Sequence, residues 1–169
     1  DRPPIGLLAD AVVTNNYEAA LEATQHLISH GHRRIAHLGD EPAASTARGR
    51  LLGFTDAMAK AGLTATSRQV NALRSEQEAY AAVHGLTQLD SPPTALFTSH
   101  YLLTLGAIRA LHDLQLENRI ALVGFDDIVL AAHTAFFAVP EVRLGFAPGP
   151  LISLFLRAID ARSLRRYLL

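Results

Sequence analysis

The sequence predicts an α/β fold, a doubly wound parallel sheet of the Rossmann-like kind with helices on both faces. Short apolar runs typical of strands alternate along the chain with helical segments of roughly 10–15 residues, as in sheets built from crossover connections. The run at 120–125, IALVGF, is almost wholly apolar, as expected for a parallel strand buried on both faces. With 169 residues, 49% of them hydrophobic, the chain can bury one substantial core.

The expected elements follow one another in a simple order. Asn15 or Asn16 is expected to cap the first helix and Thr46 the second, because their side-chain oxygens can accept from free backbone N–H groups. Gly31 and Gly62 are expected to end these two helices in the left-handed conformation. Strands are expected at 11–14, 34–38, 69–73, 94–98 and 120–125, and the later helices at 76–89 and 102–114.

The composition is typical of a globular domain from the cytoplasm. The absence of cysteine excludes disulfides and thiolate metal sites, and a net charge of -1 offers no broad positive surface for nucleic acid. The sequence contains no apolar run of about 18 residues, so no membrane segment is expected. The chain starts DRPPIG without an initiator Met, and we interpret it as part of a longer protein.

Metal binding and catalysis are not expected. His26, His30, His32 and His37 lie close in sequence, but zinc needs three or four convergent ligands, and a strand and a helix direct these rings apart. The sequence has no G-x-G-x-x-G, Walker, G-x-S-x-G or H-E-x-x-H motif, so neither a cofactor nor an enzyme activity is predicted. A doubly wound enzyme such as a phosphosugar isomerase would have only His100 and Asp126 as candidate bases.

One stretch combines a strand, a polar loop and the start of a helix: residues 30–54, HGHRRIAHLGDEPAASTARGRLLGF. Doubly wound proteins bind ligands where strands end and helices begin. Arg48 and Arg50 lie in the first turns of the expected helix, where a guanidinium can reach a polar ligand. The alternative is an ordinary strand-to-helix turn with solvated arginines.

This stretch resembles the effector-binding core of the LacI/GalR family of bacterial transcription regulators. The matching segments are HGHRRIAHLGD and STARGRLLGF, followed by PPTALFTSHYLLTLGAIRAL at 92–111 and ALVGFDD at 121–127. The resemblance covers residues 10–130 and implies a periplasmic-binding-protein-like type I fold. It assigns 1–10 to a connector and 11–130 to one effector-binding subdomain, whereas 131–169 matches poorly.

The resemblance also implies a function. Members of this family read operator DNA with an N-terminal helix-turn-helix that this chain lacks, and bind a small effector between two α/β subdomains. We therefore expect a sugar-like or nucleoside-like effector, a homodimer formed through the helix at 102–114, and DNA contact only through the missing domain. The segment 151–169 carries four arginines and is expected to be a solvated or partner-docking helix rather than a membrane or DNA helix.

The resemblance identifies five candidate ligand residues. Arg50 matches an arginine that binds sugar hydroxyls or a base edge, Thr46 matches a small hydroxyl position, and Asp126 matches an acidic ligand contact. The other two depart from the family pattern. His100, with Tyr101, replaces a usual Asn-Asp pair, and Arg74 replaces an aromatic residue. Arg74 would favour a polar or anionic ligand, and Asp126 could instead be an ordinary turn residue.

The alternative to a regulator is a periplasmic sugar-binding protein of a transport system, which shares the fold but carries an export signal. The reading frame upstream of Asp1 would distinguish the two.

Overall fold

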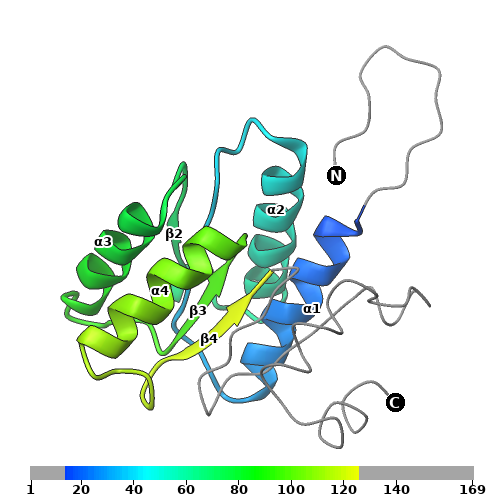
Figure 1. Cartoon of the computed structure of the whole chain (residues 1–169). Helices are drawn as coiled ribbons and strands as arrows, with labels where there is room; N and C mark the ends of the chain where they lie inside the picture. Colours follow the sequence, from blue (N-terminus) through cyan, green and yellow to red (C-terminus); the bar gives the residue numbers. More distant parts are fainter. Residues whose placement is uncertain (1–13, 126–169) are drawn as a thin grey trace, which may run out of the picture. The chain divides into compact units, whose positions relative to one another are not determined.

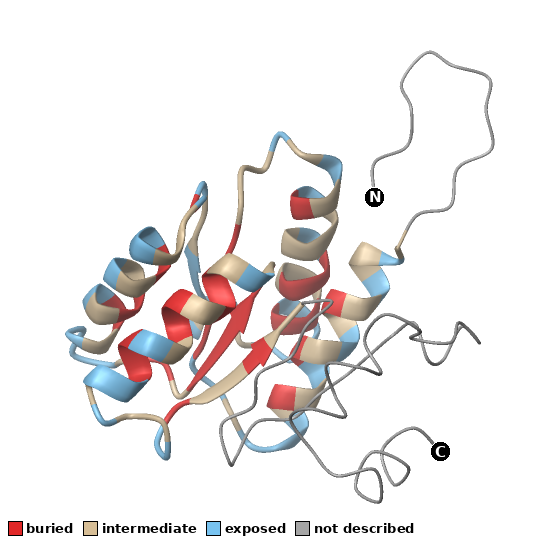
Figure 2. Ribbon diagram, in the orientation of Figure 1, coloured by how far each residue is buried: buried red, intermediate tan, exposed pale blue. Residues whose placement is uncertain are grey.

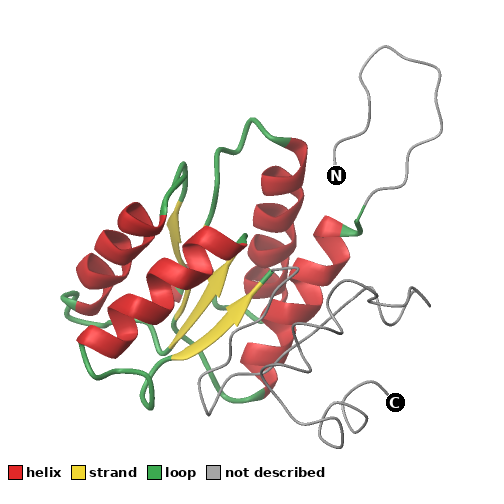
Figure 3. Ribbon diagram, in the orientation of Figure 1, coloured by secondary structure: helices red, strands yellow, loops and turns green. Residues whose placement is uncertain are grey.

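The computed structural model describes residues 14–125 of the chain, and these residues form a parallel sheet between two layers of helices (Figures 1 and 3). The predicted fold class is therefore confirmed. Three expected parts lie outside the described residues: the connector at 1–10, the strand at 11–14 apart from Thr14, and the segment 131–169.

The described elements alternate as expected. The helices are α1 (Asn16–Ser29), α2 (Ser45–Lys60), α3 (Glu76–Thr87) and α4 (Tyr101–Asp113), and the strands are β1 (Ile35–Leu38), β2 (Arg68–Val70), β3 (Ala95–Thr98) and β4 (Ala121–Gly124). A short 3-10 turn, η1 (Thr64–Thr66), precedes β2 and was not predicted. Four of the five expected strands thus fall within two or three residues of their predicted bounds.

The four strands pair in parallel in the order β2-β1-β3-β4. In the register of the two central strands, Ile35 lies opposite Ala95 and Leu38 opposite Thr98. Both central strands are buried at every residue, whereas β2 is mostly exposed and β4 is half-buried (Figure 2). The expectation that the strand at 120–125 is buried on both faces is therefore only partly correct.

The two faces of the sheet carry separate apolar clusters because side chains alternate along each strand. On one face, Ile35 and Phe97 pack with Phe54 and Met58 of α2 and with α1. On the other, a second cluster brings β1 and β3 together with α3 and α4 through the residues Ala36, Leu38, Leu96, Val83, Leu103, Ala107 and Leu111. Figure 1 shows the same arrangement, with α3 and α4 on the face opposite α1 and α2.

The C-terminal ends of the helices were predicted more accurately than their N-terminal ends. Gly31 and Gly62 have φ of +91° and +69° directly after α1 and α2, as predicted. The capping role predicted for Thr46 is wrong, because α2 begins at Ser45 and its N-cap is Ala44, which has no side-chain oxygen. Asn15 is the N-cap of α1, but its side chain makes no capping hydrogen bond.

Close contact between α3 and α4 depends on Gly106. A Cβ atom at this position would overlap the Glu76 carbonyl oxygen and would lie 2.8 Å from the Cβ of Ala79. Backbone atoms cannot move aside as a flexible side chain can, so any larger residue must separate the two helices.

We expect Gly106→Ala to lower the free energy of unfolding by about 1–3 kcal/mol, because overpacking outweighs the higher helix propensity of alanine. The matched control is Gly85→Ala in α3, where no atom lies within 4 Å of the added Cβ. That change should raise stability by up to about 1 kcal/mol. Urea denaturation of both variants measures the difference, and equal effects would contradict the close-packing role of Gly106.

Candidate functional site

The connections that leave the carboxyl ends of the neighbouring strands β1 and β3 run in opposite directions across the sheet. The chain leaves β1 through α2 towards β2, and leaves the neighbouring β3 through α4 towards β4 on the opposite side. Doubly wound proteins bind ligands in the crevice outside such a topological switch point. The geometry therefore locates the candidate site at this edge of the sheet.

The loops at this edge continue the hydrogen bonding of the sheet. The amide of Ser99 donates to the carbonyl of Leu38 at 2.9 Å, and that of Phe125 to Thr98 at 2.8 Å. The Asp40 amide donates to the Ser99 hydroxyl at 3.2 Å. These bonds hold the first residues beyond β1, β3 and β4 next to one another.

Arg50 lies on α2 and joins three elements at the switch point. Its Nε donates to Oδ1 of Asn16 at 2.7 Å, and its Nη1 donates to the carbonyl oxygen of Ser99. The guanidinium carbon lies 4.0 Å from the centre of the Phe125 ring, a cation–π arrangement. The half-buried guanidinium is thus held in a fixed orientation by contacts with α1 and with the residues that follow β3 and β4.

His100 is the N-cap residue of α4 and is half-buried beside Arg50. Burial lowers the pKa of this histidine, and the positive charge of Arg50 acts in the same direction. Asp40 and the backbone of Leu73 oppose the shift, so groups from two loops and from α2 act on one ring. The imidazole is therefore mainly neutral at pH 7 and can both donate and accept a hydrogen bond.

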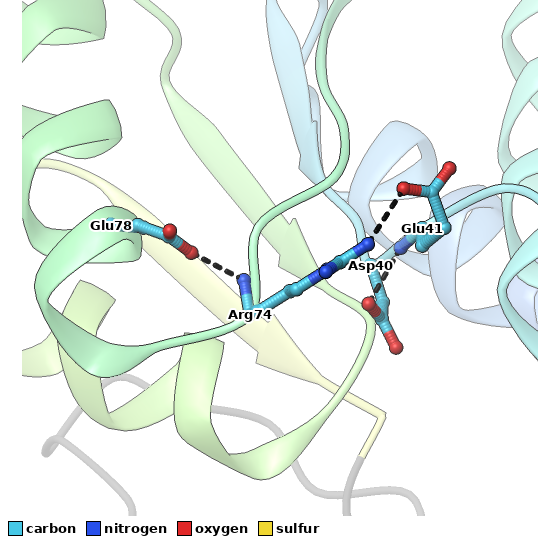
Figure 4. A network of polar contacts seen from close by, with 4 residues as sticks. All are labelled: Asp40, Glu41, Arg74 and Glu78. Carbon is cyan, nitrogen blue, oxygen red and sulfur yellow. Dashed lines mark hydrogen bonds and ion pairs between the residues drawn. The ribbon is translucent and has the colours of Figure 1, made fainter.

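Thr46 and Arg74 lie at the same edge but in different surroundings. Thr46 is half-buried in the first turn of α2. Arg74 is exposed, and its Nη2 lies 3.0 Å from Oε2 of Glu41 (Figure 4). This ion pair joins the loop after β1 to the loop after β2, but such an exposed pair contributes little stability.

The backbone of Arg74 is fixed by the start of α3. Oε2 of Glu78 accepts a hydrogen bond from the amide of Arg74 at 2.5 Å (Figure 4). The same oxygen accepts from the amide of Ser75 at 3.1 Å, and the Ser75 hydroxyl accepts from the Glu78 amide. The Arg74 amide, as the main cause, lowers the pKa of Glu78. A complete capping box therefore begins α3, whereas α2 and α4 begin without a side-chain cap.

Arg50, His100 and Thr46 thus share the carboxyl edge of the sheet, with Arg74 at its margin. Asp126 lies outside the described residues, so its ligand role stays a prediction. Among residues 14–125, no three His, Cys, Asp or Glu side chains are gathered in a way that could hold a metal ion, and no helix is long and apolar enough to cross a membrane.

The sequence interpretation missed two polar residues at this edge, His37 and Asn71. His37 was considered only as a metal ligand, yet its ring is buried against Phe54 and Phe97. The sequence did contain a signal for this burial, because His37 lies among apolar residues of a predicted strand, directly before Leu38. Burial lowers the pKa of His37 from 6.5 to about 4; Arg50 acts in the same direction, and the side chain of Asn71 opposes it.

This histidine should make stability depend on pH. Between pH 6.5 and 4 the unfolded chain binds a proton at His37 that the folded chain does not, so the free energy of unfolding falls as the pH is lowered. We expect the fall between pH 7 and pH 4.5 to be about 2 kcal/mol larger in the wild type than in His37→Phe. Urea denaturation at both pH values measures this difference, and parallel pH profiles would contradict it.

Known proteins similar to this chain are periplasmic binding protein-like domains and transcriptional regulators. Residues 24–142 match the family described as periplasmic binding protein-like domain. The chain is 29% identical over 144 residues to the HTH-type transcriptional repressor PurR of Mannheimia succiniciproducens, covering 83% of this chain and 42% of the relative. It is 32% identical over 136 residues to PurR of Haemophilus influenzae, covering 79% and 39%. The chain therefore spans about two fifths of these repressors.

Solved structures agree with the sequence matches. A LacI transcriptional regulator from a Rhodococcus species has a TM-score of 0.68 and 30% identity, covering 82% of this chain and 50% of that chain. A LacI family regulator from Enterococcus faecium with bound ribose has a TM-score of 0.62 and 25% identity, covering 69% and 44%. A sugar-binding LacI family regulator from Escherichia coli complexed with phosphate has a TM-score of 0.62 and 26% identity, covering 71% and 44%. These relatives are regulators and not enzymes.

Proposed function

We propose an effector-sensing function for this chain, which belongs to the periplasmic binding protein-like domain family. In this proposal the chain forms one wall of the effector site of a LacI-type transcriptional repressor. The observation that carries it is the fixed guanidinium of Arg50 at the switch point, between Asn16 and Ser99. A donor that is already oriented loses little freedom when it binds a ligand.

The ligand we infer is small, polar and rich in oxygen. Arg50 supplies donors, neutral His100 supplies a donor and an acceptor, and Asp40 brings an acceptor to the same edge. This combination suits a polyhydroxylated or heterocyclic ligand, such as a sugar or a nucleoside. The ribose bound to the Enterococcus faecium regulator is in keeping with this class. Thr46, Arg74 and Asp126 complete the proposed ligand set.

The proposal places DNA binding outside these residues and the protein in the cytoplasm. Effector binding would change operator affinity through the rest of the repressor. Self-association is part of the proposal: Leu102, Leu105 and Ile108 of α4 are only half-buried and recur at helical spacing. Such an outward apolar stripe is suited to a symmetric contact with a second copy.

Removing the guanidinium should weaken ligand binding. In the full-length protein, we expect Arg50→Ala to lower affinity for the bound sugar or nucleoside roughly tenfold to a hundredfold, the effect of losing about 1.5–3 kcal/mol of charged hydrogen bonding. Arg48→Ala is the matched control, because Arg48 is exposed on the same helix. Calorimetric titration with D-ribose and a panel of nucleosides measures both. Equal affinity of the wild type and Arg50→Ala would contradict the site.

The association surface has its own test. We expect the wild-type chain to sediment as a dimer at micromolar concentration and Leu105→Lys to sediment as a monomer, because a lysine cannot be desolvated in an apolar contact. Gln77→Lys on the exposed side of α3 adds the same charge elsewhere and should not change the sedimentation coefficient. A wild-type monomer at high concentration would count against this surface.

A further inference from the structure

His37 is a polar residue in β1, one of the two fully buried central strands of the sheet. Its ring packs against those of Phe54 and Phe97, with ring centres 5.3 Å and 5.5 Å away, and the residue is 1% exposed. Neither ring nitrogen has a hydrogen-bond partner among residues 14–125. A phenylalanine would fill this space without leaving a buried donor and acceptor unpaired, so packing alone does not account for a histidine here.

Asn71 shares the space next to this ring. Its Oδ1 is the other buried atom without a hydrogen-bond partner in this region, although the residue as a whole is half-buried. A Cβ added to Gly39 would lie 3.1 Å from Nδ1 of His37 and 2.8 Å from Oδ1 of Asn71. The two polar groups therefore both occupy the space above Gly39, where a side chain is missing.

The backbone around Asn71 is held firmly. The amide of Gly39 donates to the carbonyl of Val70 at 2.8 Å, and the amide of Leu73 donates to the carbonyl of Gly39 at 3.0 Å. Between these bonds Ala72 has a φ of +63°, a conformation that turns the chain sharply beyond β2. The backbone on both sides of Asn71 is thus fixed.

We propose that Asn71 is a ligand-binding residue of the site and that His37 is the positioning residue that orients its amide. In this arrangement an N–H of the imidazole faces the Asn71 oxygen, and the NH2 group is directed outward at the carboxyl edge. The Asn71 side chain already favours the protonated form of His37, as an acceptor oxygen beside the ring does.

The oriented Asn71 amide would give the site a second fixed hydrogen-bond donor, in addition to Arg50, and this affects which ligands the site selects. Arg50 donates on the β3 side of β1, and the Asn71 amide donates on the β2 side. Such a site selects ligands with acceptor oxygens at both places, such as two hydroxyls of a sugar or of a nucleoside ribose. This inference rests on the proposed function and adds a residue to the same site.

The binding test introduces a negative charge in place of the neutral amide. Asn71→Asp keeps the shape but replaces the donor NH2 by an acceptor oxygen, so we expect at least a tenfold loss of affinity for D-ribose or the best-binding nucleoside in the full-length protein. Asn118→Asp, an exposed position before β4, is the control and should bind as the wild type does. Unchanged affinity in Asn71→Asp, together with a loss in Arg50→Ala, would overturn this inference and leave the proposed function standing.

A double-variant experiment tests whether His37 acts on ligand binding through Asn71. His37→Phe keeps an aromatic ring packed against Phe54 and Phe97 but removes both nitrogens. We expect it to weaken binding about threefold to tenfold in the wild-type background and to have no further effect in the Asn71→Asp background. Losses that simply add in the double variant would show that His37 does not act through Asn71.

A measurement without ligand decides the same point independently of the effector. In the ligand-free 169-residue chain, NMR of the Asn71 side-chain amide should show one fixed orientation, with a proton on the His37 nitrogen nearest to its oxygen. His37→Phe should release the amide, so that the chemical shifts of its two N–H protons move towards those of a solvent-exposed asparagine, while the two signals stay separate because rotation about the amide C–N bond is slow. An Asn71 amide unchanged by His37→Phe would overturn the pairing, and failure of the wild type to bind any probe would count against the proposed function instead.

Discussion

Parallel pairing of β1 with β2 on one side and with β3 on the other fixes the position of the whole candidate site. The pairing continues past the strand ends, where Ser99 and Leu73 donate to the carbonyls of Leu38 and Gly39. Because side chains alternate along a strand, a slip of one residue would turn Ile35 and His37 to the opposite face of the sheet. Both the core and the polar edge therefore depend on one register.

The fixed and the exposed arginines of the site show how differently one residue type can behave. Arg50 makes contacts with three elements and is half-buried, so its fork of donors is oriented before any ligand arrives. Arg74 makes one exposed ion pair with Glu41, and solvent screens that pair strongly. The Arg74 ion pair is therefore easily exchanged for other partners, whereas the guanidinium of Arg50 is held in one orientation.

Local signals in the sequence predicted most of the fold. Apolar runs located four strands, and Gly31 and Gly62 located two helix ends, because a positive φ favours glycine. The strand at 69–73 was placed too late because β2 is an exposed edge strand and the chain turns at Ala72, a residue type that gives no turn signal. The cap at Thr46 failed for a similar reason: the loop already turns into helix at Ser45.

The site was predictable only in part. The resemblance to LacI/GalR regulators, which the matches to PurR repressors and to LacI regulator structures support, pointed to Arg50 and His100, and both lie at the switch point. The role of Asn16 as an acceptor for Arg50 was not predicted, since its amide was expected to cap a helix. Nor was the proximity of His37 and Asn71, because it results from strand register and not from any local pattern.

The helix starts at this edge differ in a way that affects motion. The capping box of Ser75 and Glu78 ties down the first turn of α3, whereas Ala44 and His100 offer no side-chain bond to the first amides of α2 and α4. Uncapped first turns open more readily, so their amide hydrogens should exchange with solvent faster than those of α3. The two helices that leave the switch point therefore begin with turns that open more readily than the first turn of α3, which places adaptable backbone next to the buried central strands.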